Sequence, residues 1–305
     1  MARSFRGRDI LSILDLSKEE IKLILKTAET LKKKPSPSLL QGKILASCFF
    51  EPSTRTRLSF EAAMLRLGGG AIGFSDTSAT STQKGESLQD AMRVVGAYAD
   101  IIILRHPLEG SSRLAAESTP TPVINAGDGA NQHPTQTLLD LYAIQECQKS
   151  VENLHVAIAG DLKYGRTAHS LAEALSYFGA RLYFISPEFL AMPNPICEGL
   201  KRREIKFSFH RSLQEVLPKC DILYMTRMQK ERFQAIDRDL SETGYILTKE
   251  MLQNVKKNFK VLHPLPRVGE IDPSVDSSPY AYYFEQAANG LFVREALLAL
   301  ILGST

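Results

Sequence analysis

The chain has 305 residues, of which 44% are hydrophobic and 23% charged, so it is long enough for two medium-sized domains and has an ordinary globular composition. A formal net charge of +3 is too small to indicate a nucleic-acid-binding surface, although it suits a cleft that gathers a few cations around a small anion. The four cysteines lie far apart, which argues against a disulfide framework or a zinc site and favours a reducing, cytoplasmic location.

The two ends of the chain argue against a membrane protein. Arg3 and Arg6 interrupt the opening residues, which is not expected of a signal peptide. The apolar run at 291–302 contains Arg294 and Glu295, so it predicts a packing helix and not a membrane span.

The first predicted helix begins at a capping box, Ser17-x-x-Glu20, in which each side chain would bond to the backbone N–H group of the other residue. Apolar residues recur at helical spacing from Ile21 to Leu31. Pro35 cannot continue a helix, so we expect the helix to end before it.

A strand followed by a helix is predicted next. The apolar run 43–50 is short enough for a buried parallel strand, and the apolar residues from Phe60 to Leu67 recur at the spacing of one helix face. The turn between them carries hydroxyl groups and arginines, namely Ser53, Thr54, Arg55, Thr56 and Arg57.

Such a turn predicts an anion site, because the first N–H groups of a helix lack partners and lie at the positive end of its dipole. A phosphate would fit there. The alternative is that Ser53 only caps the helix while Arg57 pairs with Glu61 one turn later.

Strands and helices alternate along the rest of the chain. In the first half we expect strands at 71–74, 100–104 and 123–125, and helices at 87–97, at 112–117 and from His133-Pro134 onward. In the second half we expect strands at 154–159, 181–185, 206–209, 221–225 and 260–263, and helices at 167–178, 195–203, 212–218, 249–258 and 285–302. This alternation predicts an α/β chain with two domains, each a parallel β-sheet flanked by helices.

Two apolar strands finish at an arginine, Arg105 in the first set and Arg227 in the second. Ligands of open parallel sheets bind at the carboxyl ends of the strands, so both guanidinium groups are candidates for ligand binding. The alternative is that the arginines lie at the strand ends by chance.

The turn at 160–167 resembles a phosphate-binding loop but lacks both the G-x-G-x-x-G spacing and the Gly-Lys-Ser/Thr ending, which disfavours a dinucleotide or ATP. His133 opens a helix after a glycine-rich turn, with Gln136 one turn on, which suits a neutral donor to a ligand oxygen. We assign the other lone histidines to surface or packing positions: His106, His155, His169 and His210. No metal-ligand spacing appears, and we expect no metal and no cofactor.

Six segments together resemble the aspartate/ornithine carbamoyltransferase family. They are FFEPSTRTRLSFE at 49–61, LRHP at 104–107, NQHPTQTLLDL at 131–141, GRTAHSL at 165–171, MTRMQKERF at 225–233 and HPLPR at 263–267. MTRMQ and HPLP are typical of the members that act on aspartate, whereas ornithine enzymes carry a Ser-Met-Gly segment and a cysteine. The resemblance implies transfer of the carbamoyl group of carbamoyl phosphate to L-aspartate, in pyrimidine biosynthesis.

The resemblance also implies which residues act. Carbamoyl phosphate would be bound by Ser53, Thr54, Arg55, Thr56, Arg105, His133 and Gln136, of which Arg55, Thr56, Arg105 and His133 are the catalytic candidates. Aspartate would be held by Lys84, Arg166, Arg227, Gln229, Leu265 and Pro266, and we expect a cis peptide bond at Leu265-Pro266. The domains would comprise 1–134 with 286–305 and 135–285, the C-terminal helix returning to the first domain.

By the same resemblance, Ser81 and Lys84 reach into the active site of a neighbouring subunit in a homotrimer. From the residues alone, the favoured interpretation of Lys84 is an exposed loop lysine that precedes a helix. A zinc-containing regulatory chain or a dihydroorotase is a possible partner. Two alternatives to the aspartate reaction are a carbamoyltransferase for another amine, above all ornithine, and a catalytically silent structural paralogue.

Overall fold

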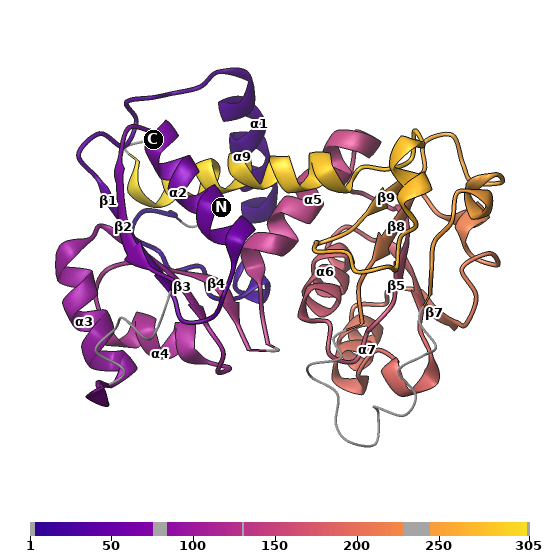
Figure 1. Ribbon diagram of the computed structural model, residues 1–305, viewed down its shortest axis with the longest axis horizontal. Helices are drawn as coiled ribbons and strands as arrows, with labels where there is room; N and C mark the ends of the chain where they lie inside the picture. Colours follow the sequence, from indigo (N-terminus) through magenta and orange to yellow (C-terminus); the bar gives the residue numbers. More distant parts are fainter. Residues whose placement is uncertain (1–3, 76–83, 130, 229–244, 304–305) are drawn as a thin grey trace. The chain divides into compact units, whose positions relative to one another are not determined.

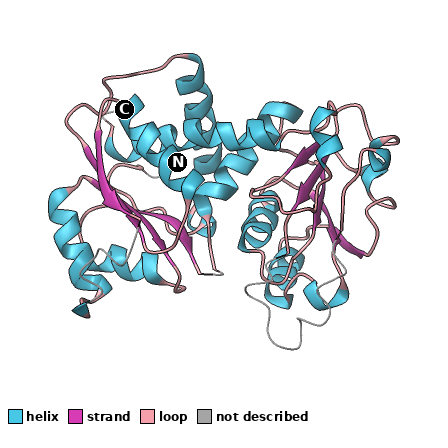
Figure 2. Ribbon diagram, viewed as in Figure 1, coloured by secondary structure: helices cyan, strands magenta, loops and turns pink. Residues whose placement is uncertain are grey.

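The computed structural model describes residues 4–75, 84–129, 131–228 and 245–303 (Figure 1). The chain forms two compact units: unit 1 comprises 1–139 and 288–305, and unit 2 comprises 140–287. Each unit contains one β-sheet, and every strand pair within the two sheets is parallel (Figure 2). The predicted α/β class, with a parallel sheet in each domain, is therefore confirmed.

Unit 1 holds a sheet of four strands in the order β2-β1-β3-β4. Its elements in chain order are η1 (Ile13–Asp15), α1 (Lys18–Lys33), β1 (Ile44–Phe49), α2 (Thr54–Arg66), β2 (Gly70–Phe74), α3 (Leu88–Tyr98), β3 (Ile101–His106), α4 (Ser111–Ser118) and β4 (Val123–Asp128). Helix α5 (Pro134–Gln148) begins in this unit and continues into unit 2.

The strand order places the helices of unit 1 on opposite faces of its sheet. The connection through α2 leads from β1 to β2, toward one edge of the sheet, whereas the connections through α3 and α4 lead toward the opposite edge, to β3 and β4. Because such crossovers are right-handed, α2 covers one face of the sheet and α3 and α4 cover the other. The buried residues on the α3 and α4 face include Cys48, Met92, Leu104 and Ala115.

Helix α1 starts at the predicted capping box. The hydroxyl oxygen of Ser17 accepts the backbone N–H of Glu20 at 3.2 Å, and the Glu20 carboxylate accepts the backbone N–H of Ser17 at 2.8 Å. The end of the chain packs here too, because the Lys32 ammonium lies 5.2 Å from the Phe292 ring centre and the Gly7 N–H donates to the Ile301 carbonyl at 3.1 Å. Helix α9 (Tyr283–Leu302) thus returns to unit 1, as predicted.

Unit 2 holds a sheet of five strands in the order β7-β6-β5-β8-β9. Its elements are β5 (His155–Ala159), α6 (Arg166–Ser176), β6 (Arg181–Ile185), η4 (Glu188–Leu190), α7 (Asn194–Arg202), β7 (Phe207–His210), η5 (Leu217–Lys219), β8 (Ile222–Met225), η7 (Glu250–Leu252), β9 (Lys260–Leu262) and η8 (Pro273–Ser277). The same handedness argument puts α6 and α7 together on one face.

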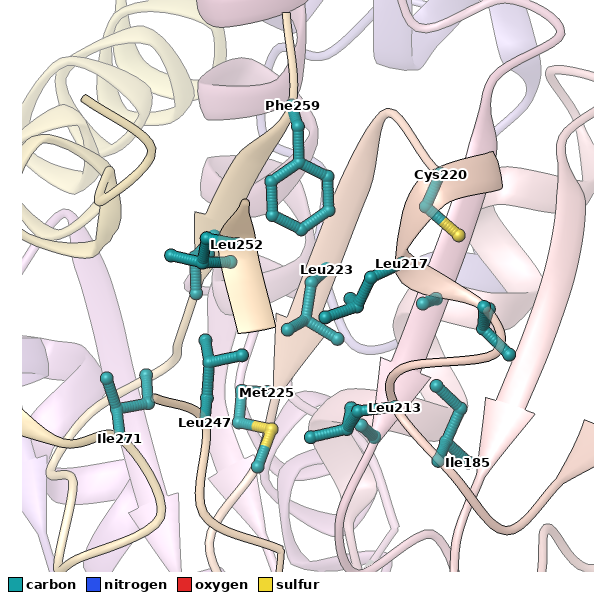
Figure 3. Packing of buried hydrophobic residues seen from close by; sticks show 14 of the residues in the cluster. Ile185, Leu213, Leu217, Cys220, Leu223, Met225, Leu247, Leu252, Phe259 and Ile271 are labelled. Carbon is teal, nitrogen blue, oxygen red and sulfur yellow. The ribbon is translucent and has the colours of Figure 1, made fainter. Parts of the chain in front are cut away.

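The other face of this sheet is covered by loops and short 3-10 turns. Leu223 and Met225 of β8 point into a core with Leu217, Leu247 and Phe259 (Figure 3). Alternate residues of the same strand, such as Tyr224, face the opposite side, as the two-residue period of a strand requires. The apolar residues that cover this face come mostly from loops and from the 3-10 turns η5, η7 and η8, with Tyr283 from the start of α9.

Two predicted helices of unit 2 are wrong. The segments 212–218 and 249–258 contain only the short turns η5 and η7. Their apolar residues, including Leu213, Leu217 and Leu252, are buried as a helix face would be. The segments are too short for a helix to be stable by itself, and the packing of these side chains favours tight turns instead.

Candidate active site

The first half of the candidate site lies where the connections of the unit 1 sheet diverge. Strands β1 and β3 are neighbours, and the chain leaves β1 toward one edge of the sheet and β3 toward the other. Such a switch point opens a crevice at the carboxyl ends of the strands. Phe49 of β1 pairs with Arg105 of β3, so Arg105 and the residues that follow β1 lie at the same edge of the sheet.

Ser53 is the N-cap residue of α2, but its side chain accepts no capping hydrogen bond from the helix. The alternative interpretation of Ser53 as an ordinary cap is therefore wrong. Thr56 in the first turn is buried, whereas Thr54 and Arg55 are exposed. Arg57 donates to Glu61 at 2.8 Å, as expected for a pair one helical turn apart, and also to the Ser75 hydroxyl. The first turn of α2 thus presents N–H groups, hydroxyl groups and Arg55 to the crevice edge.

Arg55 and Arg105 are close enough to influence each other. Partial burial, and then the positive charge of Arg105, lower the pKa of Arg55 from its ordinary value. Arg105 also donates to the carboxylate of Glu51 and, at 3.4 Å, to the carbonyl of Ala126. An anion placed here would relieve the repulsion between the two guanidinium groups.

Glu51 was not identified from the sequence as a functional residue. Glu51 lies two residues beyond β1, and Arg105 lies at the end of the adjacent parallel strand, so strand register would have placed them together. Its carboxylate orients the guanidinium of Arg105 and offsets part of its charge.

His133 directly precedes α5 and Gln136 lies in the first turn of that helix, and both residues are buried. Thr135 Oγ1 lies 3.5 Å from His133 Nδ1, and the N–H of Gln136 donates to the His133 carbonyl at 3.0 Å. The chain therefore carries an imidazole and an amide at the end of β4, on the same edge of the sheet as Arg105.

Asp128 organises the turn between β4 and α5 and was also missed. Its buried carboxylate accepts four N–H groups: Asn125 Nδ2 at 2.9 Å, Gly110 N at 2.9 Å, Asn131 Nδ2 at 3.0 Å and Gln132 N at 3.1 Å. The Gly110 bond ties the segment after β3 to the segment after β4. Asp128 thus fixes the backbone that leads to His133.

The second half of the candidate site lies at the corresponding position in unit 2. The switch point there falls between β5 and β8. Arg166, the first residue of α6 after β5, has a buried side chain, and Arg227 lies two residues beyond β8 with a half-buried one. Gly160, with φ 116°, lets the two loops approach, because a Cβ atom there would lie 2.2 Å from the carbonyl oxygen of Thr226.

Leu265 and Pro266 follow β9, the neighbour of β8, and so lie at the same edge as Arg166 and Arg227. The peptide bond between them is cis, as predicted. Lys84 is exposed and lies just before α3 in unit 1. Ser81 and Gln229 lie outside the described residues.

The four cysteines carry free thiols. Burial raises the pKa of Cys48, Cys147 and Cys220 to about 12, so these thiols stay protonated and are poor nucleophiles. In the part of the chain that the structure describes, no group of three or more His, Cys, Asp or Glu residues is placed to hold a metal ion. No described helix combines the length and apolar character needed to cross a membrane.

Residues 8–146 match the family model for the aspartate/ornithine carbamoyltransferase carbamoyl-P binding domain, and residues 152–301 match the model for the Asp/Orn binding domain. The chain is 56% identical over 298 residues to the aspartate carbamoyltransferase catalytic subunit of Chromobacterium violaceum, covering 98% of this chain and 99% of that one. It is also 56% identical to the corresponding subunit of Aliivibrio fischeri, covering all of both chains.

Solved structures show the same likeness. The catalytic subunit of M. jannaschii aspartate transcarbamoylase is 50% identical with a TM-score of 0.88, covering 95% of this chain and 96% of that one. The Trypanosoma cruzi aspartate transcarbamoylase, solved with carbamoyl phosphate and aspartate, is 36% identical with a TM-score of 0.92, covering 98% of both chains.

Proposed function

The chain belongs to the aspartate/ornithine carbamoyltransferase family, and we propose that it transfers the carbamoyl group of carbamoyl phosphate to the amine of L-aspartate. The products are N-carbamoyl-L-aspartate and phosphate, in an early step of pyrimidine biosynthesis. The observation that carries this proposal is that two cations, Arg55 and Arg105, lie close enough to repel each other beside the start of α2, at the switch point of the unit 1 sheet.

Carbamoyl phosphate binds in unit 1. The hydroxyl groups of Ser53 and Thr54, the first N–H groups of α2 and the Arg55 guanidinium bind the phosphate. Thr56, Arg105 and His133 donate to the carbonyl oxygen, and the Gln136 amide orients the carbamoyl group. Thr56, His133 and Gln136 are buried, which supports this assignment because donors shielded from water act more strongly on developing charge.

Aspartate binds in unit 2. Its two carboxylates need separate cationic partners, and the forked guanidinium groups of Arg166 and Arg227 suit them better than lysine would. The backbone at Leu265 and Pro266 contacts the amine, and Gln229 is proposed as a further ligand. The described residues support this assignment, because Arg166, Arg227 and the Leu265-Pro266 pair follow the carboxyl ends of three adjacent parallel strands, β5, β8 and β9.

The uncharged amine of aspartate attacks the carbonyl carbon of carbamoyl phosphate. A C–N bond forms, the carbonyl oxygen takes up negative charge, and the tetrahedral intermediate collapses with loss of phosphate and of the amine proton. No covalent bond to the enzyme is needed. Catalysis rests on positioning two anions and on stabilising the oxyanion and the leaving phosphate.

The active enzyme is a cytoplasmic homotrimer in which Ser81 and Lys84 complete the site of a neighbouring subunit. Mixing two inactive variants, Arg55→Ala and Lys84→Ala, tests this. If sites are shared, some mixed trimers contain one site without either substitution and activity returns, whereas sites confined to single chains would stay inactive. The name "catalytic subunit" of the relatives supports a regulatory partner chain, zinc-containing in our proposal, with a dihydroorotase as the alternative.

The decisive experiment is an assay with carbamoyl phosphate and three amine acceptors: aspartate, ornithine and putrescine. We expect phosphate release with aspartate. Release with ornithine only would overturn the proposal in favour of an ornithine-type enzyme, and no release with any acceptor would favour a silent paralogue.

A further inference from the structure

A buried and a mostly buried ionisable side chain lie at the two ends of the loop that follows β9, and the proposed reaction uses neither. They are His263, whose side chain is 1% exposed, and Glu270, whose side chain is 10% exposed. The loop between them, residues 264–269, contains Leu265 and Pro266; we call it the acceptor loop. In contrast to His263 and Glu270, the acceptor loop is little buried, and Val268 is 75% exposed.

Two hydrogen bonds tie the acceptor loop to this pair, and a third joins the two members of the pair. His263 Nδ1 accepts the backbone N–H of Leu265 at 2.8 Å, and His263 Nε2 lies 2.6 Å from Glu270 Oε1. The other carboxylate oxygen of Glu270 accepts the backbone N–H of Val268 at 2.9 Å. The imidazole and the carboxylate therefore hold the loop on both sides of Pro266.

This pattern determines where the imidazole carries its proton. An N–H group of the backbone can only donate, so His263 Nδ1 must be the bare, accepting nitrogen. The ring proton is then on Nε2, which donates to Glu270. In agreement, burial would raise the pKa of Glu270, but the hydrogen bonds from His263 and from the Val268 backbone lower it.

The backbone at Leu265 needs such support. Its φ of 53° lies in the left-handed region, which is unfavourable for a leucine. Conformations of this kind persist only where the surroundings hold them in place. The His263 bond acts directly on the amide of this residue, and the backbone of His263 is itself anchored by its N–H, which donates to the Gln286 side chain at 2.8 Å.

We propose that His263 and Glu270 are positioning residues for the acceptor amine: they preset the backbone of the acceptor loop at Leu265 and Pro266 before aspartate binds. The inference rests on the proposed function, since that function assigns aspartate to this loop. A purely structural role for the pair predicts a loss of stability without a selective effect on aspartate.

Two substitutions of His263 separate the two bonds of its ring. In His263→Asn the amide oxygen takes the place of Nδ1 and can still accept from Leu265, but the side chain is too short to reach Glu270. In His263→Gln the amide nitrogen takes the place of Nε2 and can still donate to Glu270, but Leu265 loses its acceptor. Each variant therefore serves as the control for the other.

We expect His263→Gln to raise the KM for aspartate by about tenfold or more, with the KM for carbamoyl phosphate and the thermal midpoint close to those of His263→Asn. His263→Asn should stay within about threefold of the wild type in its aspartate KM. Equal aspartate KM values for the two variants would overturn the proposal. Should both variants fail to fold, Glu270→Gln decides instead, because one amide oxygen cannot replace both carboxylate oxygens and the aspartate KM should rise selectively.

A measurement without turnover tests the geometry itself. Neutron diffraction of the wild-type protein should show hydrogen on His263 Nε2 and none on Nδ1, and a proton on Nδ1 would refute the inferred bond to Leu265. A wild-type protein that does not carbamoylate aspartate would instead refute the proposed function. The neutron result would still test the hydrogen bond between His263 and Leu265, because that measurement does not depend on turnover.

Discussion

Arg105, at the end of β3, lowers the pKa of Arg55 in the first turn of α2 through its positive charge, an effect second only to the partial burial of Arg55. Two cations held in this way repel each other when no ligand is present. The arrangement therefore costs stability in the empty protein and stabilises an anion when one is bound. The two arginines of this turn therefore differ in role: Arg55 faces the charge of Arg105, whereas the guanidinium of Arg57 is bonded to the carboxylate of Glu61.

Replacing Arg55 by alanine should nearly abolish turnover while the fold survives. We expect a loss of about 100- to 1,000-fold in kcat, the usual cost of one donor to developing charge. The thermal midpoint should be unchanged or slightly raised, because repulsion from Arg105 is removed. Arg57→Ala is the matched control, and it should stay within about threefold of the wild type since a partly exposed ion pair within one helix contributes little. Near-normal activity of Arg55→Ala would refute the phosphate assignment.

Replacing Arg227 by alanine should raise the KM for aspartate steeply, by about tenfold or more, because one carboxylate loses its forked partner. The KM for carbamoyl phosphate should change little, since that substrate is assigned to unit 1. Steady-state kinetics with each substrate varied in turn would measure both. Arg211→Ala, which removes an exposed arginine of the same unit that pairs with Glu188, is the control. An unchanged aspartate saturation curve would show that the second half of the site is misplaced.

The inner strands of both sheets could be predicted from the sequence because buried parallel strands are continuous apolar runs, whereas the edge strands β2 and β7 are short and only partly buried. The sequence also predicted α1, since the Ser17 and Glu20 pattern is a local signal and the helix has enough residues to show one apolar face. The helices predicted at 212–218 and 249–258 were wrong because the buried leucines of these segments have the spacing of a helix face, although the segments form turns. Local spacing could not reveal that difference.

Arg105 and Arg227 could be singled out as candidate ligand residues from the sequence because they lie at, or two residues beyond, the carboxyl ends of apolar strands. Their supporting residues could not. Asp128 collects N–H groups from Gly110 and from its own turn, and Glu51 faces Arg105 only because β1 and β3 are neighbours. Strand order is a property of the folded sheet, so these contacts become visible only in three dimensions.

Replacing Asp128 by asparagine should both destabilise the protein and slow the reaction. The asparagine oxygen can accept only part of the four N–H groups, and its NH2 group would face the remaining donors. Leaving buried donors unsatisfied costs about 1–3 kcal/mol, measurable by denaturant unfolding. Displacement of the turn before His133 should also lower kcat/KM for carbamoyl phosphate. Asn131→Ala is the control because Asn131 is exposed and Asp128 would keep three partners, and an equal loss in both variants would contradict this role for Asp128.

Replacing Glu295 by glutamine should stabilise the protein at neutral pH. Burial in α9 raises the pKa of Glu295 above its ordinary value of 4.5, and Arg66, at 3.7 Å, offsets only part of this effect. The folded state therefore holds the proton more tightly than the unfolded state does, so stability is highest below the unfolded pKa and is lost as the pH rises through the raised folded pKa.

Glutamine removes this loss, because it stays neutral throughout. We expect the thermal midpoint of Glu295→Gln to exceed that of the wild type at pH 7, and the difference to shrink as the pH falls and to vanish below about pH 3.5, where the carboxyl group is protonated in both states. Glu198→Gln is the control with the opposite sign, since the hydrogen bond and charge of Lys201 lower the pKa of that exposed carboxyl group. A Glu295→Gln variant that is less stable than the wild type at pH 7 would show that the ion pair with Arg66 outweighs the cost of burial.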